Sequence, residues 1–376
     1  MNKKRSLLLV LISLLALIVL YLAGRGSLLE WRKARLYAAG ESAIAAGNWE
    51  EAQAQFDALL ALDPTYRDAQ QRRDEALRGA IGHVAGGDEW ESEVALLRQI
   101  AASGDRATLA EVLDRCVVTI PAGEFLMGND VGPHDERPQR LVYLDGYEID
   151  RYEVTNVQYQ RFAREMGREP PPHWSGDEYP PGQANYPAAG VTRDDAEAYC
   201  AWAGKRLPTE AEWEKACRGT GGRIYPWGDG WDPSRANVDA FKGDQSKHWA
   251  YTEPGIVGWG DDWGPLQVTP EGPGVPGLRP VGSYPEGASP YGAMGLVGGV
   301  SEWVADWYNW DGYWDVPDRN PIVLEPRWNR ALRGSSWYPY NIVGLAQDRS
   351  RCSARNSSHR GTPDARVGFR CARSIP

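Results

Sequence analysis

The chain begins with an unbroken apolar run at residues 6–24, in which no charged side chain occurs. A helix rises about 1.5 Å per residue, so a run of this length reaches roughly the 30 Å thickness of a bilayer's hydrocarbon core. Basic residues at positions 3–5 precede it, and the positive-inside rule predicts residues 1–5 as a cytoplasmic stub, with everything after Arg25 exported. A cleaved signal peptide is the alternative, although no small-x-small cleavage site follows. We therefore expect a single-pass transmembrane anchor in the cell membrane and a large extracytoplasmic part.

Residues 33–115 have the spacing of apolar positions that is typical of helices. One segment of this region is similar to a single tetratricopeptide unit in its small and large positions, namely Gly40, Ile44, Gly47, Trp49, Ala52, Phe56, Leu59 and Pro64. Gly47 with Asn48 forms the predicted turn between two helices, and Pro64 ends the second helix. The region is either a partner-binding groove or a spacer above the membrane, and one repeat is short for the usual concave surface.

The pattern changes at Val117, after which short strands and short helices alternate with long irregular segments. Such an arrangement predicts an α+β fold rather than repeated βαβ units. Three helix starts carry capping boxes or an acidic variant of one: Thr155 with Gln158, Thr192 with Asp195, and Thr209 with Glu212. We expect these pairs to begin helices and to have no other role.

Composition narrows the possible functions. The chain contains 42 Gly, 27 Pro and 17 Trp, which indicates many turns and loops held by large aromatic side chains. Its net charge is −10, and without a basic stripe this charge would repel a phosphate backbone, so we expect no nucleic-acid partner. The five histidines show no metal-ligand spacing, and neither a nucleophile elbow nor a phosphate-binding glycine loop occurs.

Seven motifs follow one another in the second part of the chain, at residues 120–128, 152–162, 199–219, 225–229, 295–303, 331–337 and 368–374. Together they resemble the formylglycine-generating enzyme family, also called the sulfatase-modifying factor family. The resemblance implies that residues 117–376 form a loop-rich fold related to C-type lectins. It also implies an oxidoreductase ancestry, since oxidising members use copper and oxygen to convert a sulfatase cysteine to formylglycine.

The five cysteines lie in the part of the chain that we expect to be exported. Four cysteines can pair in three ways and leave one odd residue. The family resemblance implies the pairs Cys200 with Cys371 and Cys217 with Cys352. Four free buried thiols in a reducing compartment are the alternative. Cys116 is the odd residue beside these two pairs, and we expect it to be a small buried hydrophobe or a site of intermolecular pairing.

The family's oxidase chemistry requires two nearby thiolates, because these soft ligands hold the copper and one of them pairs with the substrate cysteine. The positions that match these two cysteines carry Pro339 and Gly344, and no cysteine occurs between Cys217 and Cys352. We therefore expect no copper site, no catalytic residues of the family's kind and, in consequence, no enzyme activity of that kind.

Calcium is the cofactor that the resemblance favours, in a structural role. A glycine-bent loop can turn several carbonyl groups toward one point while a carboxylate completes the hard-oxygen ligands that calcium prefers. The family's calcium loop maps onto Gly295, Gly298, Val300 and Glu302, and its second site maps onto Asn237 and Val238, with Asp262 and Gly264 as further candidates. The alternative for Glu302 is a capped helix start, with Trp303 and Trp307 facing the core.

Three functions remain open. The first is a membrane-tethered binding module, whose groove around Ser336, Trp337, Tyr338 and Tyr340 takes a peptide, glycan or protein ligand. The second is an enzyme of the same family with altered oxidative chemistry. The third is a structural part of a cell-envelope assembly, recruited through the helical region. The resemblance of fold does not choose between them.

Overall fold

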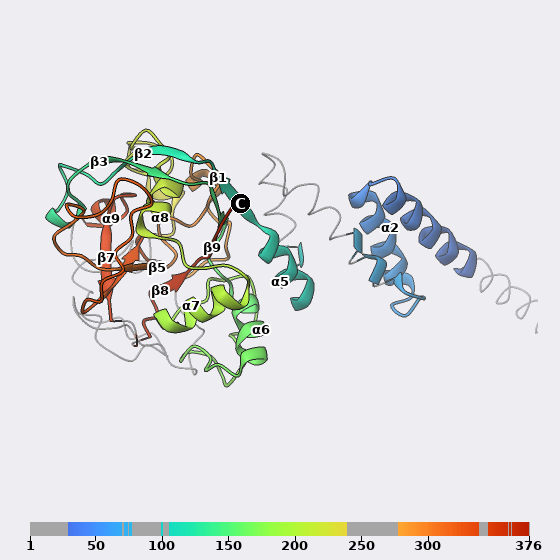
Figure 1. The fold of residues 1–376 in the computed structure, drawn as a ribbon. Helices are drawn as coiled ribbons and strands as arrows, with labels where there is room; N and C mark the ends of the chain where they lie inside the picture. Colours follow the sequence, from blue (N-terminus) through green and yellow to red (C-terminus); the bar gives the residue numbers. More distant parts are fainter. Residues whose placement is uncertain are drawn as a thin grey trace, which may run out of the picture. The chain divides into compact units, whose positions relative to one another are not determined.

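The computed structural model of the chain describes residues 29–69, 71–73, 75–76, 99–100, 105–238, 277–337, 345–359, 361 and 363–375. Contacts divide the chain into two compact units, Met1–Gly87 and Asp88–Pro376 (Figure 1). The predicted anchor at residues 6–24 lies outside the described residues. Within the described ranges, no helix has the length and apolar character needed to cross a membrane.

The first unit contains a pair of helices joined by a tight turn. Residues 29–45 are helical, and α2 spans Trp49–Leu62. The turn between them uses a positive φ of 72° at Gly47, which glycine adopts without strain. Phe56 is fully buried, and a Cβ atom at Gly40 would lie 2.6 Å from its ring, so the two helices approach closely at this point. The structure thus has the predicted helical hairpin, and its kinship to tetratricopeptide repeats stays a prediction.

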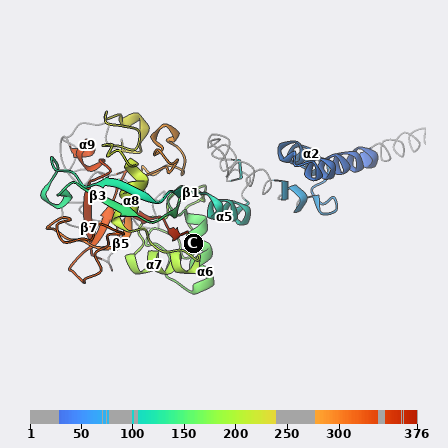
Figure 2. The same cartoon turned by 45° about the horizontal axis from the view of Figure 1, so that its top comes forward.

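The second unit is a mixed α+β domain, as predicted (Figures 1 and 2). Its α-helices are α5 (Arg106–Arg115), α6 (Asn156–Met166), α7 (Arg193–Trp202), α8 (Glu210–Arg218) and α9 (Leu345–Arg349). Its strands are β1 (Val117–Ile120), β2 (Gly123–Met127), β3 (Arg140–Leu144), β4 (Tyr147–Asp150), β5 (Ser301–Trp307), β6 (Arg330–Arg333), β7 (Arg355–Ser358), β8 (Val367–Phe369) and β9 (Ala372–Ser374). Short 3-10 turns occur at η1 (His134–Glu136), η2 (Pro233–Arg235) and η4 (Pro285–Gly287).

Three small sheets organise this domain. β4 lies between β1 and β9, and β2 pairs with β3 as a hairpin. The largest sheet has the order β7-β6-β5-β8, in which only the β5–β8 pair is parallel among the described strands. The first and last strands of the domain therefore share one sheet, and β8, the strand before the last, lies at the edge of the sheet that contains β5.

The predicted helix starts are confirmed for all three capping pairs. At α8, the Glu212 amide donates to the Thr209 hydroxyl at 3.1 Å, and the Thr209 amide donates to the Glu212 carboxylate at 2.8 Å. α6 begins with the equivalent box at Thr155, and the Thr192 hydroxyl accepts from the first turn of α7. Each arrangement satisfies amides that the helix itself leaves without a partner.

Helix α5 belongs to the large domain, which differs from the predicted boundary at residues 115–117. The carboxylate of Asp114 on α5 accepts a hydrogen bond of 2.8 Å from Gln158 on α6 and pairs with Arg161. Arg106 also reaches Glu178, at 2.8 Å. The predicted helical region 33–115 is therefore divided between the two units, because α5 packs with α6 through these charged and polar contacts.

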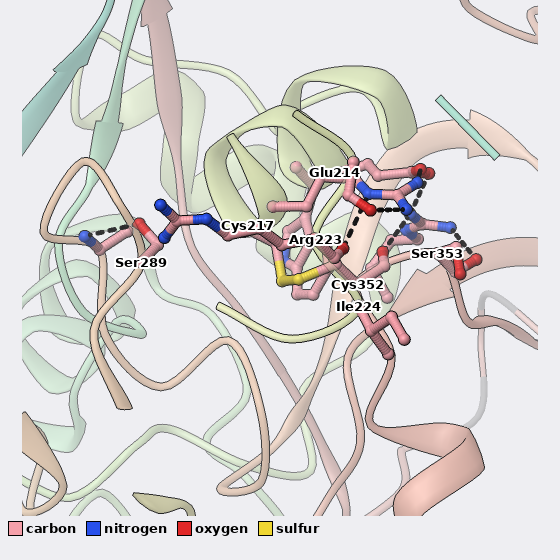
Figure 3. The surroundings of a disulfide bond; sticks show 12 residues. Glu214, Cys217, Arg223, Ile224, Ser289, Cys352 and Ser353 are labelled. Carbon is pink, nitrogen blue, oxygen red and sulfur yellow. Dashed lines mark hydrogen bonds and ion pairs between the residues drawn. A yellow bond between two sulfur atoms is a disulfide. The ribbon is translucent and has the colours of Figure 1, made fainter. Parts of the chain in front are cut away.

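Two disulfides join distant parts of the large domain, with the pairing that the family resemblance implies. Cys200 of α7 is bonded to Cys371, and Cys217 of α8 is bonded to Cys352. Figure 3 shows the second bond, with Glu214 one turn before Cys217 on the same helix and Ile224 beside Cys352. The Cys352 amide donates to the Ile224 carbonyl at 2.8 Å. Both bonds lie in the core, since all four cysteines are fully buried.

Candidate functional site

The two segments predicted to bind calcium lie side by side. Asn237 forms an isolated parallel bridge with Gly298, and the Gly299 amide donates to the Asn237 carbonyl at 3.2 Å. Gly298 has a positive φ of 78°, and a Cβ atom there would lie 2.5 Å from the Asn237 carbonyl oxygen. Only glycine allows this approach. What the sequence suggested as two separate sites is therefore one region of the domain.

A pocket opens beside this contact, with a volume of about 420 Å³ that includes the part open to solvent. Its lining combines a buried carboxylate, two arginines and backbone of the glycine-rich loop. The polar and glycine residues of that lining are Glu153, Arg235, Asn237, Arg279, Gly282, Ser283, Tyr284, Gly287, Gly295 and Gly299. Val238 and Val300 lie in the same two segments and are buried.

Glu302, the carboxylate predicted as a ligand in the first calcium loop, is already bound by protein groups. Its oxygens accept two hydrogen bonds of 2.7 Å from the Arg370 guanidinium, and one of 2.9 Å from the indole nitrogen of Trp213. All three side chains are fully buried. The alternative of a helix start at Glu302 is wrong, because the residue lies in strand β5. Of the two tryptophans that this alternative placed against the core, Trp303 is buried and Trp307 is half-buried.

Glu153 is the functional candidate that the sequence analysis missed. It is 4% exposed, and a side chain at Gly295 would collide with its carboxylate, while a Cβ atom at Gly299 would lie 2.5 Å from it. The carboxylate lies 4.0 Å from the Arg370 guanidinium. Burial raises the pKa of Glu153 to about 8, against the opposing influence of Arg370 and with a further contribution from Glu302. The sequence feature that could have identified Glu153 as a site residue is its position in the motif at residues 152–162.

Arg370 therefore faces two buried carboxylates. It also donates to the backbone carbonyls of Asp150, Arg151 and Met294, at 3.1, 3.0 and 2.8 Å. With one guanidinium for Glu153 and Glu302, this part of the core carries an excess of one negative charge when both carboxyls are ionised. A buried charge of this kind is costly unless a proton or a cation neutralises it.

The predicted aromatic groove is not exposed where the structure describes it. Ser336 is 2% exposed and Trp337 is fully buried, so neither side chain presents a surface to a ligand. The Trp337 amide donates to the Gly299 carbonyl at 2.7 Å, which holds this segment against the glycine-rich loop. Tyr338 and Tyr340 lie outside the described residues, as do Pro339 and Gly344 and the further calcium candidates Asp262 and Gly264.

The cysteines leave no pair of thiols for copper. Four of the five are in disulfides, and the fifth, Cys116, is buried at the end of α5. Its thiol donates to the Val112 carbonyl at 3.3 Å, as a buried small hydrophobe can. Among the described residues, no group of three or more His, Cys, Asp or Glu side chains has the arrangement of a metal site.

Several known proteins are similar to this chain. A family model described as a sulfatase-modifying factor enzyme 1-like domain matches residues 102–375. The formylglycine-generating enzyme of Mus musculus is 30% identical over 302 residues, covering 68% of this chain and 74% of the mouse protein. A second Mus musculus protein, named inactive C-alpha-formylglycine-generating enzyme 2, is 30% identical over 315 residues, covering 72% of this chain and 89% of its own. The structure of PvdO from Pseudomonas aeruginosa has a TM-score of 0.49 and 25% identity, over 69% of this chain and 94% of PvdO. This chain belongs to the sulfatase-modifying factor family.

Proposed function

We propose that the family domain of this chain, residues 117–376, is a binding module for a peptide, glycan or protein partner and does not carry out the copper-dependent oxidation. The observation that carries this proposal is the state of the cysteines. Copper of the family's kind needs two thiolates, and this chain has four disulfide-bonded cysteines and one buried thiol. The relative named as an inactive formylglycine-generating enzyme supports the part of this proposal that concerns the oxidation.

The proposal predicts that the purified chain, given copper, oxygen and a peptide with the sequence Cys-x-Pro-x-Arg, forms no aldehyde above the rate without protein. Without two thiolates the copper has no soft site, and the substrate cysteine has no thiol or metal to activate it. Mass spectrometry of the peptide would detect the loss of sulfur. The mouse formylglycine-generating enzyme, assayed in parallel, provides the positive control, and conversion by this chain at a comparable rate would contradict the proposal.

We also propose that residues 6–24 anchor the chain in the membrane, that the helical unit serves as a spacer, and that the large domain lies on the extracytoplasmic side. The two disulfides support this location, because structural disulfides form in oxidising compartments. Protease added to intact cells is expected to release the large domain. Digestion that requires lysis of the cells would place the domain on the other side.

For calcium, we propose one structural ion in the pocket that Glu153, Asn237 and Gly295 line. The residues fit a hard cation in one respect, since the buried Glu153 carboxyl lies 4.0 Å from Arg370, whose guanidinium is bound to Glu302, and a bound cation would take the place of its proton. Backbone carbonyls of the glycine-rich loop that line the pocket would complete the oxygen ligands that calcium prefers, whereas Gly298, Val300 and Val238 do not line it. Because Arg370 already binds the Glu302 carboxylate, Glu153 takes the role that the sequence assigned to Glu302.

This proposal predicts that millimolar calcium raises the melting temperature by several degrees, because an ion that binds only the folded state at 100 times its Kd stabilises by about 2.7 kcal/mol. Replacement of Glu153 by Gln should abolish the response. Glu325→Gln, at an exposed position, is the matched control and should keep it. Calorimetry in calcium, in magnesium and in chelator measures the effect. Identical melting curves of the unaltered chain in calcium, in magnesium and in chelator would contradict the proposed calcium site.

A further inference from the structure

An irregular segment between β5 and β6 exposes large aromatic side chains in an ordered turn. Residues 310–315 form one run of turns, in which Trp310 is 68% exposed and Trp314 is 61% exposed. Each tryptophan is followed by an exposed aspartate, Asp311 or Asp315. Within the described residues, neither aspartate forms an ion pair. The turn thus presents the same combination twice, an aromatic face with a carboxylate beside it.

The inner residues of this turn hold it firmly to the domain. Tyr313 is 1% exposed, its amide donates to the Arg137 carbonyl at 2.8 Å, and its carbonyl accepts from Arg140 at 2.7 Å. Gly312 lies against the backbone of Arg137 so closely that a Cβ atom would collide with it. These contacts fix the backbone of a segment whose outer side chains are apolar and exposed. A fixed aromatic side chain loses little conformational entropy on binding, which favours recognition.

The chain itself indicates which ligand suits this combination, because three of its partly exposed arginines lie over an aromatic ring and pair with a nearby carboxylate, as the buried Arg333 and Arg355 also do. Arg106 lies 4.7 Å from the centre of the Tyr179 ring and 2.8 Å from the adjacent Glu178. The other two sets are Arg161 with Trp202 and Asp114, and Arg319 with Tyr143 and Asp145. A planar guanidinium suits both partners, since it stacks on aromatic faces and donates to carboxylates.

We propose that the Trp310–Asp315 turn binds arginine side chains of a partner polypeptide, each guanidinium stacking on a tryptophan and pairing with the neighbouring aspartate. Two such positions lie in one short turn, so a partner segment with at least two arginines is the best fit. The net charge of −10 would attract such a segment before contact. This inference rests on the proposed binding function and names the surface and the chemistry of the partner.

The test uses the full-length chain in detergent and fluorescently labelled octa-arginine and octa-lysine, with anisotropy measured at 150 mM salt. We expect octa-arginine to bind more tightly than octa-lysine, because only arginine has the planar group that stacks well. The double variants Trp310→Ala with Trp314→Ala, and Asp311→Asn with Asp315→Asn, should each weaken octa-arginine binding about tenfold.

Trp328 provides the matched control, since it is 94% exposed in the same segment but lies between Arg327 and Asn329. Trp328→Ala should change octa-arginine affinity less than twofold. Equal binding of the two peptides, with unchanged affinity in the tryptophan variants, would overturn the proposal in favour of general charge attraction. The proposal would also be overturned if the two tryptophans bound a neutral oligosaccharide and not the peptides, or if the chain bound neither the oligosaccharide nor either peptide. The aldehyde assay reports on the oxidation separately, so the two proposals can fail independently.

Discussion

Replacing Arg370 by Met is expected to lower the free energy of unfolding by about 3–5 kcal/mol, because it leaves the Glu302 carboxylate in the core without its cation. Glu302 would lose both hydrogen bonds from the guanidinium, and Glu153 would lose the charge that lies 4.0 Å from it. Three backbone carbonyls would also lose a donor. Urea unfolding at neutral pH, with the chain kept in chelator, measures the difference.

Arg373→Met is the matched control, three residues further along the chain. Arg373 pairs with Glu148 on β4, but 53% of its side chain is exposed, and exposed ion pairs contribute at most about 1 kcal/mol. A second variant, Arg370→Met with Glu302→Leu, removes both charges of the buried pair and should recover part of the loss. If Arg370→Met cost no more than Arg373→Met, the buried pair would not be the stabilising element that its geometry indicates.

Removing the disulfide between Cys217 and Cys352, by replacing both residues with Ala, is expected to cost about 2–5 kcal/mol. The bond closes a segment of 135 residues, and in the chain-entropy model such a long closed loop restricts the unfolded chain strongly. Thermal unfolding of the variant and of the unaltered chain gives the difference, and thiol titration in denaturant reports the state of the cysteines.

Cys116→Ala is the matched control for this second prediction, because Cys116 is equally buried but forms no disulfide. We expect this substitution to cost about 1 kcal/mol, as small changes in a core do. The unaltered chain should show one reactive thiol after unfolding. Five reactive thiols would mean that the disulfides do not form in the cell, and the argument for an extracytoplasmic domain would lose its support.

The sequence predicted best what depends on neighbouring residues. The capping pair Thr209 and Glu212 lies within one helical turn, so its outcome is nearly independent of the rest of the fold. The hairpin around Gly47 is local in the same sense. The disulfide pairing could be predicted only through the family resemblance, because spacing alone permits three arrangements of four cysteines.

The site was harder to predict, because its chemistry depends on residues far apart in the chain. Trp303 and Trp307 are four residues apart, a spacing that places side chains on one face in a helix and also in a strand, so the pattern could not distinguish the two at Glu302. The partner that decides the role of Glu302 is Arg370, 68 positions away. Burial of Trp337 likewise follows from packing that no local pattern records.

Residues 367–374 form several of the bonds that complete the domain. Strand β8 closes the sheet beside β5, Arg370 neutralises Glu302, Cys371 bonds to Cys200, and β9 pairs with β4. Chains emerge from the ribosome with the N-terminal end first, and domains generally fold as units. The domain therefore cannot complete its fold until residues 367–374 have been synthesised. Until then the growing chain exposes apolar side chains, and the edges of β4 and β5 lack their partners β9 and β8, which makes it a substrate for chaperones.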